Sequence, residues 1–118
     1  MILHITTRGE WQSALNSGEY RAPSLADEGF IHCSTENQVL TVANAFYRGV
    51  PDLVLLVIDE TKLNAHVKWE APAGAPADGI SESDLFPHIY GAINTNAVSS
   101  VLDLVPDSAG MYILPPRT

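Results

Sequence analysis

Three short segments of the chain each carry a histidine followed, two positions later, by a residue with a hydroxyl group. The pairs are His4 and Thr6, His32 and Ser34, and His88 and Tyr90. Residues two apart on a β-strand point to the same face, so each pair would present an imidazole beside a hydroxyl. Imidazoles accept, donate or carry a proton near neutral pH, and hydroxyls can orient a ligand. We therefore predict that the three segments meet around one polar cleft.

A carboxylate completes this set of groups. Glu70 ends a short run, VKWE, just before a stretch that contains two prolines and two glycines. At the border of such a loop a carboxylate can act as a general base or stabilise a cationic transition state. We therefore predict catalytic roles for Glu70, His32 and His4. The other polar residues are predicted to bind the substrate: Thr6, Ser34, Thr35, His88 and Tyr90.

A structural role is the alternative for the same residues. A histidine on a half-buried strand commonly bonds to backbone groups, because a buried polar side chain generally finds a partner. Glu70 could equally be a solvated carboxylate paired with Lys68. The repetition of one pattern in three segments favours a shared site over three independent structural histidines.

Metal binding and cysteine catalysis fit the sequence less well. Four side chains could ligate a metal: His4, His32, His88 and Cys33. Their spacing matches none of the CxxC, HExxH or HxH arrangements, so we predict no metal. Cys33 would point away from His32 on a regular strand, which favours a buried and unreactive thiol. The sequence also lacks the glycine-rich loops of Rossmann and P-loop nucleotide sites.

The composition indicates a globular protein with a single domain over residues 1–118. Hydrophobic residues make up 46% of the chain, too many for a disordered protein. Six Lys and Arg stand against 14 Asp and Glu, which gives a formal charge of -8. Binding to nucleic acid or to an anionic membrane requires a basic surface, so we predict neither partner. A small molecule is the favoured ligand.

The expected location follows from targeting signals and cysteine content. The N-terminus has no basic segment followed by a long apolar run, so we predict no signal peptide. The longest apolar run, Leu53 to Ile58, is too short to span a bilayer. The single cysteine cannot form an internal disulfide and fits a reducing compartment. We expect a cytoplasmic protein.

Local patterns predict an α+β fold. Two capping boxes, each a threonine followed three residues later by Glu or Gln, predict helices over residues 8–16 and from about residue 36. The segment between them, residues 19–29, is predicted to be a loop. Strands are expected at residues 2–5, 30–33, 53–58, 67–70, 85–90, 97–105 and 110–114. Because the helices come before most of the strands, we predict two N-terminal helices packed on a mixed, mostly antiparallel sheet.

Three segments have more specific expectations. The continuously apolar segment 53–58 predicts a central strand buried on both faces. Pro87 has no backbone N–H to donate, so the segment 85–90 is predicted to be an edge strand or a bulged one. Residues 71–79, rich in proline and glycine, are predicted to be an exposed loop.

Several motifs resemble those of a bacterial and plant family known as domain of unknown function 952. They are, in chain order, LHITTRGEW, PSLADEGFIHCSTENQV, LVLLVID, VKWE and LFPHIYG. That family is grouped with the ADP-ribosyltransferase-like fold, a split β-sheet whose cleft holds NAD in the catalytic members. The resemblance therefore implies a split sheet for this chain, and NAD as the cofactor to test.

The same resemblance implies roles for individual residues. His4 and Thr6 occupy a place similar to the early strand of those enzymes, which carries His or Arg followed by a small hydroxyl residue. Residues 32–35 look like a loose counterpart of a Ser-Thr motif on a central strand. Glu70 would be the glutamate that stabilises the oxocarbenium-like sugar as nicotinamide leaves. In this chain Glu70 precedes the HIYG segment, and no Gln/Glu-x-Glu motif surrounds it.

Three hypotheses about function follow. The first is an enzyme, a small transferase or hydrolase acting on a nucleotide-like or sugar-like ligand, for example an ADP-ribosyl or glycosyl group. The second is a binding module that holds a small metabolite in the same cleft without converting it. The third is an interaction protein in which the polar strand ends are structural.

Overall fold

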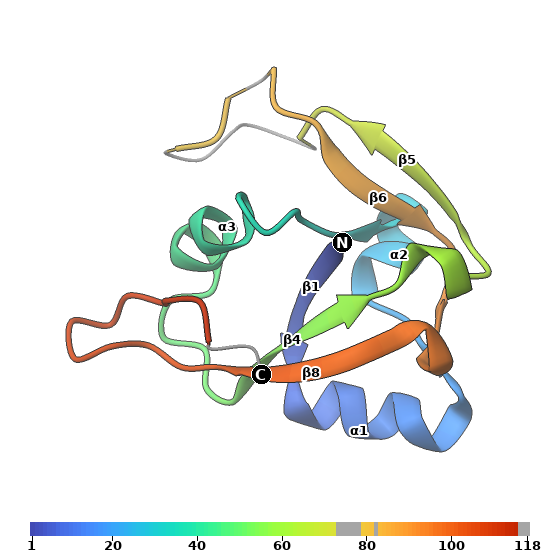
Figure 1. Ribbon diagram of the computed structural model, residues 1–118, viewed down its shortest axis with the longest axis horizontal. Coiled ribbons are helices and arrows are strands. Elements are labelled where there is room, and N and C mark those ends of the chain that lie inside the picture. Colours follow the sequence, from blue (N-terminus) through green and yellow to red (C-terminus); the bar gives the residue numbers. More distant parts are fainter. Residues whose placement is uncertain (73–78, 82, 116–118) are drawn as a thin grey trace.

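Two three-stranded sheets and a two-stranded one form the fold, together with three α-helices (Figure 1). The computed structural model describes residues 1–72, 79–81 and 83–115. Every strand pair among these residues is antiparallel. The predicted α+β class with mostly antiparallel pairing is therefore confirmed, whereas the chain forms three α-helices where two were predicted.

The first sheet has the strand order β1–β4–β8, formed by Ile2–Thr7, Leu53–Ile58 and Val98–Leu104. β4 is the central strand and all of its residues are buried, as its apolar sequence predicts. Its alternate side chains enter two hydrophobic clusters, one on each face of the sheet. Burial on both faces fixes the register, because a shift by one residue would move each set of alternate side chains to the opposite face of the sheet. In this register His4 lies opposite Leu56.

The second sheet has the strand order β3–β6–β5, formed by Ile31–His32, Phe86–Tyr90 and His66–Glu70. The prediction that the segment around Pro87 forms an edge strand is wrong, because β6 lies between β3 and β5. The Pro87 carbonyl accepts the N–H of Cys33 at 3.1 Å. The nitrogen of Pro87 therefore faces the point where β3 ends and no further ladder bond is required.

The arrangement of the sheets brings two of the histidines together. His32 on β3 lies directly opposite His88 on β6. The first and second sheets are joined where the backbones of Leu3 and Ser34 exchange two hydrogen bonds of 2.8 Å. In the described part of the chain no further backbone pair links β1 to β3.

Helix α1, Arg8–Ser17, begins and ends as its sequence predicts. The Thr7 hydroxyl accepts the N–H of Glu10 at 3.2 Å, which forms one half of the expected capping box. Gly18 follows the helix in the left-handed region, with φ of 87°, and its N–H bonds back to the Ala14 carbonyl.

Helix α2, Pro23–Glu28, occupies a segment predicted to be a loop, so that prediction is wrong. Proline stands in the first turn, where a missing N–H costs nothing. Gly29 ends the helix in the left-handed region, with φ of 86°. The segment therefore carries both a start and a stop signal, although it is too short for an apolar periodicity to stand out.

Helix α3, Val39–Phe46, begins three residues after the predicted start. Residues 36–38 form a turn instead, and the Thr35 carbonyl accepts the N–H of both Gln38 and Val39. Val39 and Ala43 are the helix residues that enter the core. In the described chain no helix is long and apolar enough to cross a membrane.

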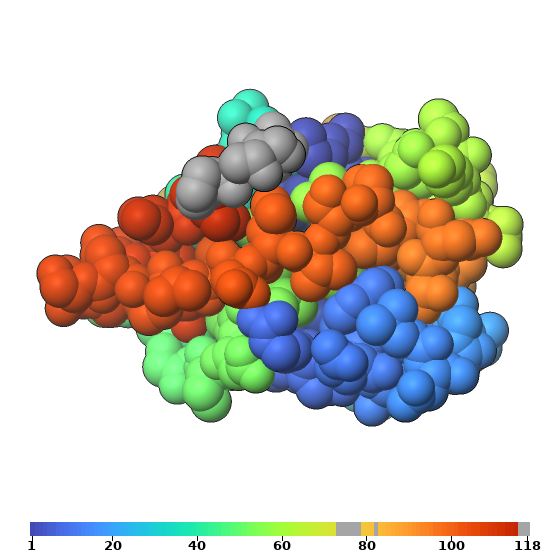
Figure 2. Space-filling model, turned by 60° about the horizontal axis from the view of Figure 1, so that its bottom comes forward, coloured from blue at the N-terminus to red at the C-terminus, as the bar shows by residue number. Residues whose placement is uncertain are grey.

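Short elements complete the chain: β2 (Glu19–Tyr20), β7 (Ile93–Asn94), and the 3-10 turns η1 (Glu60–Lys62) and η2 (Thr95–Ala97). The predicted strand at 110–114 is wrong, because only an isolated bridge forms there, between Tyr112 and Pro106. Figure 2 shows β8 lying at the surface above α1 and the segment after β8 extending away from the body. Most of the predicted loop 71–79 falls outside the described residues.

Candidate functional site

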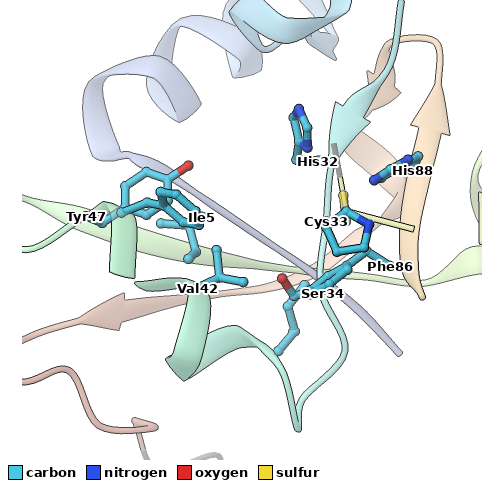
Figure 3. A pocket seen from close by; sticks show the side chains of 11 residues that line it. Ile5, His32, Cys33, Ser34, Val42, Tyr47, Phe86 and His88 are labelled. Atoms are coloured by element: carbon cyan, nitrogen blue, oxygen red, sulfur yellow. The ribbon is translucent and has the colours of Figure 1, made fainter. Parts of the chain in front are cut away.

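A cavity of about 450 Å³, which we call the first cavity, lies beside the junction of the two sheets (Figure 3). Most of its walls are apolar and come from β1, α3 and β6, including Leu3, Ile5, Val42 and Phe86. His32, Ser34 and His88 supply polar groups. Sites for small molecules commonly combine apolar walls with a few polar groups. Three of the predicted site residues therefore share one cavity.

A carboxylate holds one side of the His88 ring. Nδ1 of His88 lies 2.9 Å from Oε1 of Glu70, and the Tyr90 hydroxyl donates to the same oxygen at 2.5 Å. The hydrogen bond from Tyr90, followed by the one from His88, keeps the pKa of Glu70 below its ordinary value. Glu70 is therefore ionised at neutral pH and can only accept, so Nδ1 of His88 carries a proton.

The other ring nitrogen of His88, Nε2, has no hydrogen-bond partner among the described residues. His88 is buried, yet in the described chain no fully buried side-chain nitrogen or oxygen lacks a partner. Nε2 must therefore reach solvent, and Figure 3 shows one ring nitrogen of His88 directed towards the first cavity. In the neutral tautomer that carries its proton on Nδ1, Nε2 has a lone pair that can accept a proton from a bound molecule.

Aromatic packing fixes the His88 ring and brings a second imidazole beside it. Phe30 stacks on His88 with ring centroids 4.2 Å apart and planes inclined by 19°. The ring of His32 lies edge-on to His88, with a centroid distance of 5.4 Å. Nε2 of His32 is in turn 2.7 Å from a carboxylate oxygen of Glu28. The first cavity is thus bordered by two imidazoles, each bonded to a carboxylate through one nitrogen.

His4 is bonded to the protein at both ring nitrogens. Nδ1 lies 2.6 Å from the backbone carbonyl oxygen of His32, and Nε2 lies 2.9 Å from the hydroxyl of Tyr20. Burial lowers the pKa of His4 to about 4, although the bond to the carbonyl acts to raise it. The ring is therefore neutral at pH 7, with Nδ1 donating to the carbonyl and Nε2 accepting from Tyr20.

A line of hydrogen bonds extends from this histidine. The hydroxyl oxygens of Tyr20 and Thr6 lie 3.0 Å apart. Since the Tyr20 proton is directed to His4, the Thr6 hydroxyl is the group that donates to the Tyr20 oxygen. The line therefore runs from Thr6 through Tyr20 and His4 to the backbone of His32, and it ties β1 to the segment that carries His32.

His4 and Thr6 line a second cavity, of about 410 Å³, which adjoins the first. Four residues line both cavities: Ile5, His32, Phe46 and Tyr47. His32 therefore stands between the other two histidines, with His88 on the side of the first cavity and His4 on the side of the second. Neither ring nitrogen of His4 is free to bind a ligand.

Three predicted site residues line neither cavity: Glu70, Tyr90 and Thr35. Glu70 and Tyr90 reach the first cavity only through His88. The N–H of Thr35 donates to a side chain in the turn before α3 at 3.0 Å. Within the described residues Glu70 pairs with His88 rather than with Lys68, whose ammonium group lies 4.8 Å from the centre of the Tyr90 ring.

The cysteine belongs to the hydrophobic core. Cys33 is buried, as predicted, and burial raises the pKa of its thiol far above the ordinary value. A thiol of this kind is a poor nucleophile. Searched over the described chain, His, Cys, Asp and Glu side chains form no group of three or more that could hold a metal ion.

Sequence reasoning missed three aromatic residues of the site: Phe30, Tyr20 and Tyr47. Phe30 lies two positions before His32, so the alternation of a strand could have placed both on one face. Tyr20 lies in a segment predicted to be a loop, and Tyr47 follows the last residue of α3. No periodic pattern marks either tyrosine, and only their contacts across the fold reveal them.

Comparisons with known proteins identify relatives over almost the whole chain. The model of a family described as "Protein of unknown function (DUF952)" matches residues 5–101. The chain is similar to the crystal structure of protein CC0527 from Caulobacter crescentus, with a TM-score of 0.78 and 34% identity, covering 95% of this chain and 92% of that one. The solution NMR structure of CC0527 has a TM-score of 0.73 and 32% identity, covering 93% and 89%. Among curated proteins none matches this sequence.

Proposed function

The chain belongs to the DUF952 family, and from this premise we propose that it is an enzyme acting on a nucleotide-like or sugar-like small molecule in the first cavity. The reaction is the transfer or hydrolysis of a glycosyl group, of which ADP-ribosyl is one example. His88 is the general base, Glu70 fixes its orientation, and His32 and Ser34 orient the ligand.

One observation carries this proposal, namely the arrangement of Glu70 and His88. Nδ1 of His88 is bonded to an ionised carboxylate at 2.9 Å, while Nε2 has no partner among the described residues and faces the first cavity. A carboxylate on one ring nitrogen fixes the tautomer and stabilises the imidazolium that forms when the other nitrogen gains a proton.

In the hydrolytic form of the reaction, Nε2 of His88 accepts a proton from water while the water oxygen bonds to the anomeric carbon. The bond between that carbon and the leaving group breaks, and the leaving group departs with the bonding electron pair. A positively charged leaving group, such as the nicotinamide of NAD, departs as a neutral molecule and needs no proton. His88 then returns its proton to solvent. In transfer, an acceptor hydroxyl takes the place of water.

The charge of the first cavity limits which part of a ligand can enter it. Of the residues that the structure describes, neither Lys nor Arg lines this cavity, so a phosphate group would find no Lys or Arg partner among them. We therefore place the base and sugar in the cavity and any phosphate in solvent. For NAD, the candidate that the family resemblance implies, this places the nicotinamide riboside end inside.

The test is an assay of the purified protein with NAD, nucleosides and simple glycosides. Products are separated by chromatography, and binding is followed by the melting temperature. We expect at least one compound to raise the melting temperature and to be converted. Replacing the base, His88→Asn, should then lower the rate about 100-fold or more, the usual contribution of general base catalysis.

His66→Asn is the matched control. His66 is exposed on β5, next to the strand that carries His88, and it lines neither cavity. The control should convert the substrate at the wild-type rate. A His88→Asn variant that kept the wild-type rate would show that this histidine is not the base.

A binding module is the second candidate, and the position of Glu70 favours it. Among the described residues no carboxylate lines the first cavity, so none of their negative charges directly faces the sugar of a bound ligand. Such a site could hold a metabolite without stabilising a cationic transition state. A compound that raises the melting temperature of the wild type, with no product formed in the same incubation, would favour binding over catalysis.

A further inference from the structure

The second cavity differs from the first in composition. Three aromatic rings line it, those of Tyr20, Phe46 and Tyr47. One carboxylate, that of Glu10, lies in the same wall. The described lining of the first cavity also includes three aromatic rings, those of Phe46, Tyr47 and Phe86, but no carboxylate. The second cavity therefore combines π-faces with a negative charge.

Two of these residues have groups that lack a partner within the described fold: Phe46 exposes apolar surface, and Tyr47 has a hydroxyl without a hydrogen-bond partner. Phe46 is the last residue of α3 and is 60% exposed, an unusual state for so large an apolar side chain. The Tyr47 hydroxyl has no hydrogen-bond partner in the part of the chain that the structure describes. Tyr47 packs against a hydrophobic cluster through its ring, whereas core packing does not account for the exposed ring of Phe46.

The electrostatics of the second cavity favour positive charge. Its described lining contains neither Lys nor Arg, and the deeply buried imidazole of His4 is neutral at pH 7. Burial raises the pKa of Tyr20 and Tyr47, and the charge of Glu10 raises both further. The protein as a whole carries a formal charge of -8, which also attracts cations.

We propose that the second cavity is a binding subsite for a small organic cation, an ammonium or guanidinium group held between the Glu10 carboxylate and the rings of Tyr20, Phe46 and Tyr47. An organic cation gains from the aromatic faces and from the carboxylate at once. An anionic ligand would meet only Glu10 and is disfavoured. This subsite requires no reaction in the first cavity, so it stands or fails independently of the proposed enzyme.

The test is an NMR titration of the backbone amides with n-butylammonium, using neutral 1-pentanol, of the same length, as the comparison. A probe of this size can reach a Kd of about 1 mM. We expect saturable shifts at residues 6–10 and 20–24, which border the second cavity, with smaller shifts around His88. 1-Pentanol should bind about tenfold more weakly, because it has the chain but not the charge.

Glu10→Gln is the decisive variant, because a glutamine side chain can still accept the hydrogen bond from the Thr7 hydroxyl and loses only the charge. It should weaken binding of n-butylammonium about tenfold and leave 1-pentanol unaffected. Glu60→Gln, a change of the same kind at an exposed residue of η1, should have no effect. Tyr47→Leu should also weaken binding of the cation, whereas Tyr47→Phe should not, because phenylalanine retains the aromatic ring.

The proposal is overturned if n-butylammonium causes no saturable shift up to about 20 mM, or if Glu10→Gln binds it as the wild type does. Equal binding of the cation and of 1-pentanol would also overturn it, since the site would then be merely apolar. If the protein binds the cation but converts none of the donor compounds, the subsite is supported and the proposed enzyme activity is contradicted. If the protein converts a donor compound but does not bind the cation, the enzyme activity is supported and the subsite is contradicted.

Discussion

His4 and His88 are almost equally buried, yet the protein bonds them differently. Their exposed fractions are 6% and 3%, and each is followed two residues later by a hydroxyl residue. His4 uses both ring nitrogens in bonds to the protein, whereas His88 uses only Nδ1. Neither burial nor the sequence pattern distinguishes the structural histidine from the one that we propose as the general base. The number of ring nitrogens left without a partner does.

The partner of Nδ1 also differs between the two histidines. In His4 it is a neutral backbone carbonyl, and burial without a compensating charge lowers the pKa to about 4. In His88 it is the carboxylate of Glu70, which stabilises a positive ring. The first arrangement keeps a ring neutral and rigid. The second suits a ring that gains and loses a proton during a reaction.

The largest expected effect comes from replacing the structural histidine, His4→Phe. Phenylalanine fills a similar volume but leaves the His32 carbonyl and the Tyr20 hydroxyl without their buried partner. An unsatisfied buried polar group costs about 1–3 kcal/mol, so the free energy of unfolding at pH 7 should fall by about 3 kcal/mol. Urea denaturation measures this loss. A change below about 0.5 kcal/mol, as expected for a surface substitution, would show that the network stabilises nothing.

The same variant should remove a pH dependence of stability. The pKa of His4 is about 4 in the folded protein against 6.5 for a solvent-exposed histidine, so the unfolded chain binds the proton more readily. The contribution of neutral His4 is complete above pH 6.5 and is lost as the pH falls to 4. The wild type should lose about 3 kcal/mol over this interval, and the difference between wild type and His4→Phe should close.

Protonation of Glu70 cannot cause the same loss of stability between pH 6.5 and 5. The pKa of Glu70 is lowered from 4.5, so its contribution is present above that pH and is lost only as the pH falls through the folded value. Denaturation curves between pH 6.5 and 5 therefore report on His4 alone of these two groups. A wild type with constant stability over that range would contradict a neutral, buried His4.

Local sequence signals predicted the elements whose cause is local. The apolar run of β4 gave a buried central strand, and Thr7 with Glu10 marked the start of α1. α2 was missed because its signals, Pro23 and Gly29, flank only one and a half turns and leave no room for a periodic apolar face. The prediction of an edge strand around Pro87 failed for a different reason, which is that the deciding contact is not local. The local rule for proline is valid, but only the end of β3 shows that the missing N–H is harmless.

The candidate site likewise has a part that the sequence predicted and a part that it did not. The histidine pattern predicted one cleft shared by His4, His32 and His88; the first cavity contains His32 and His88, whereas His4 lines the second. Which nitrogen of each histidine stays free was beyond sequence reasoning. The answer depends on Tyr20, which comes from a segment predicted to be a loop, and on a backbone carbonyl 28 residues from His4.

A smaller effect is expected for the partner of the reactive histidine, Glu70→Gln. Glutamine can still accept from Nδ1 of His88, but it cannot stabilise the imidazolium by its charge. Loss of such a supporting group typically costs about 10-fold to 100-fold, so we expect turnover in the first cavity to fall about tenfold. The assay is the one that identifies the substrate. The loss of stability between pH 6.5 and 5 should remain as in the wild type, because His4 is untouched.

The smallest effect is expected for Tyr90→Phe, which removes the hydroxyl that donates to Glu70 at 2.5 Å. That hydrogen bond is the main cause of the lowered pKa of Glu70, so its loss raises this pKa and moves the acidic limb of the activity profile to higher pH. At pH 7 turnover should fall only about threefold. Since the hydroxyl acts through the carboxylate, the double variant with Glu70→Gln should be no slower than Glu70→Gln alone. Independent, multiplying losses would mean that Tyr90 contacts the ligand itself.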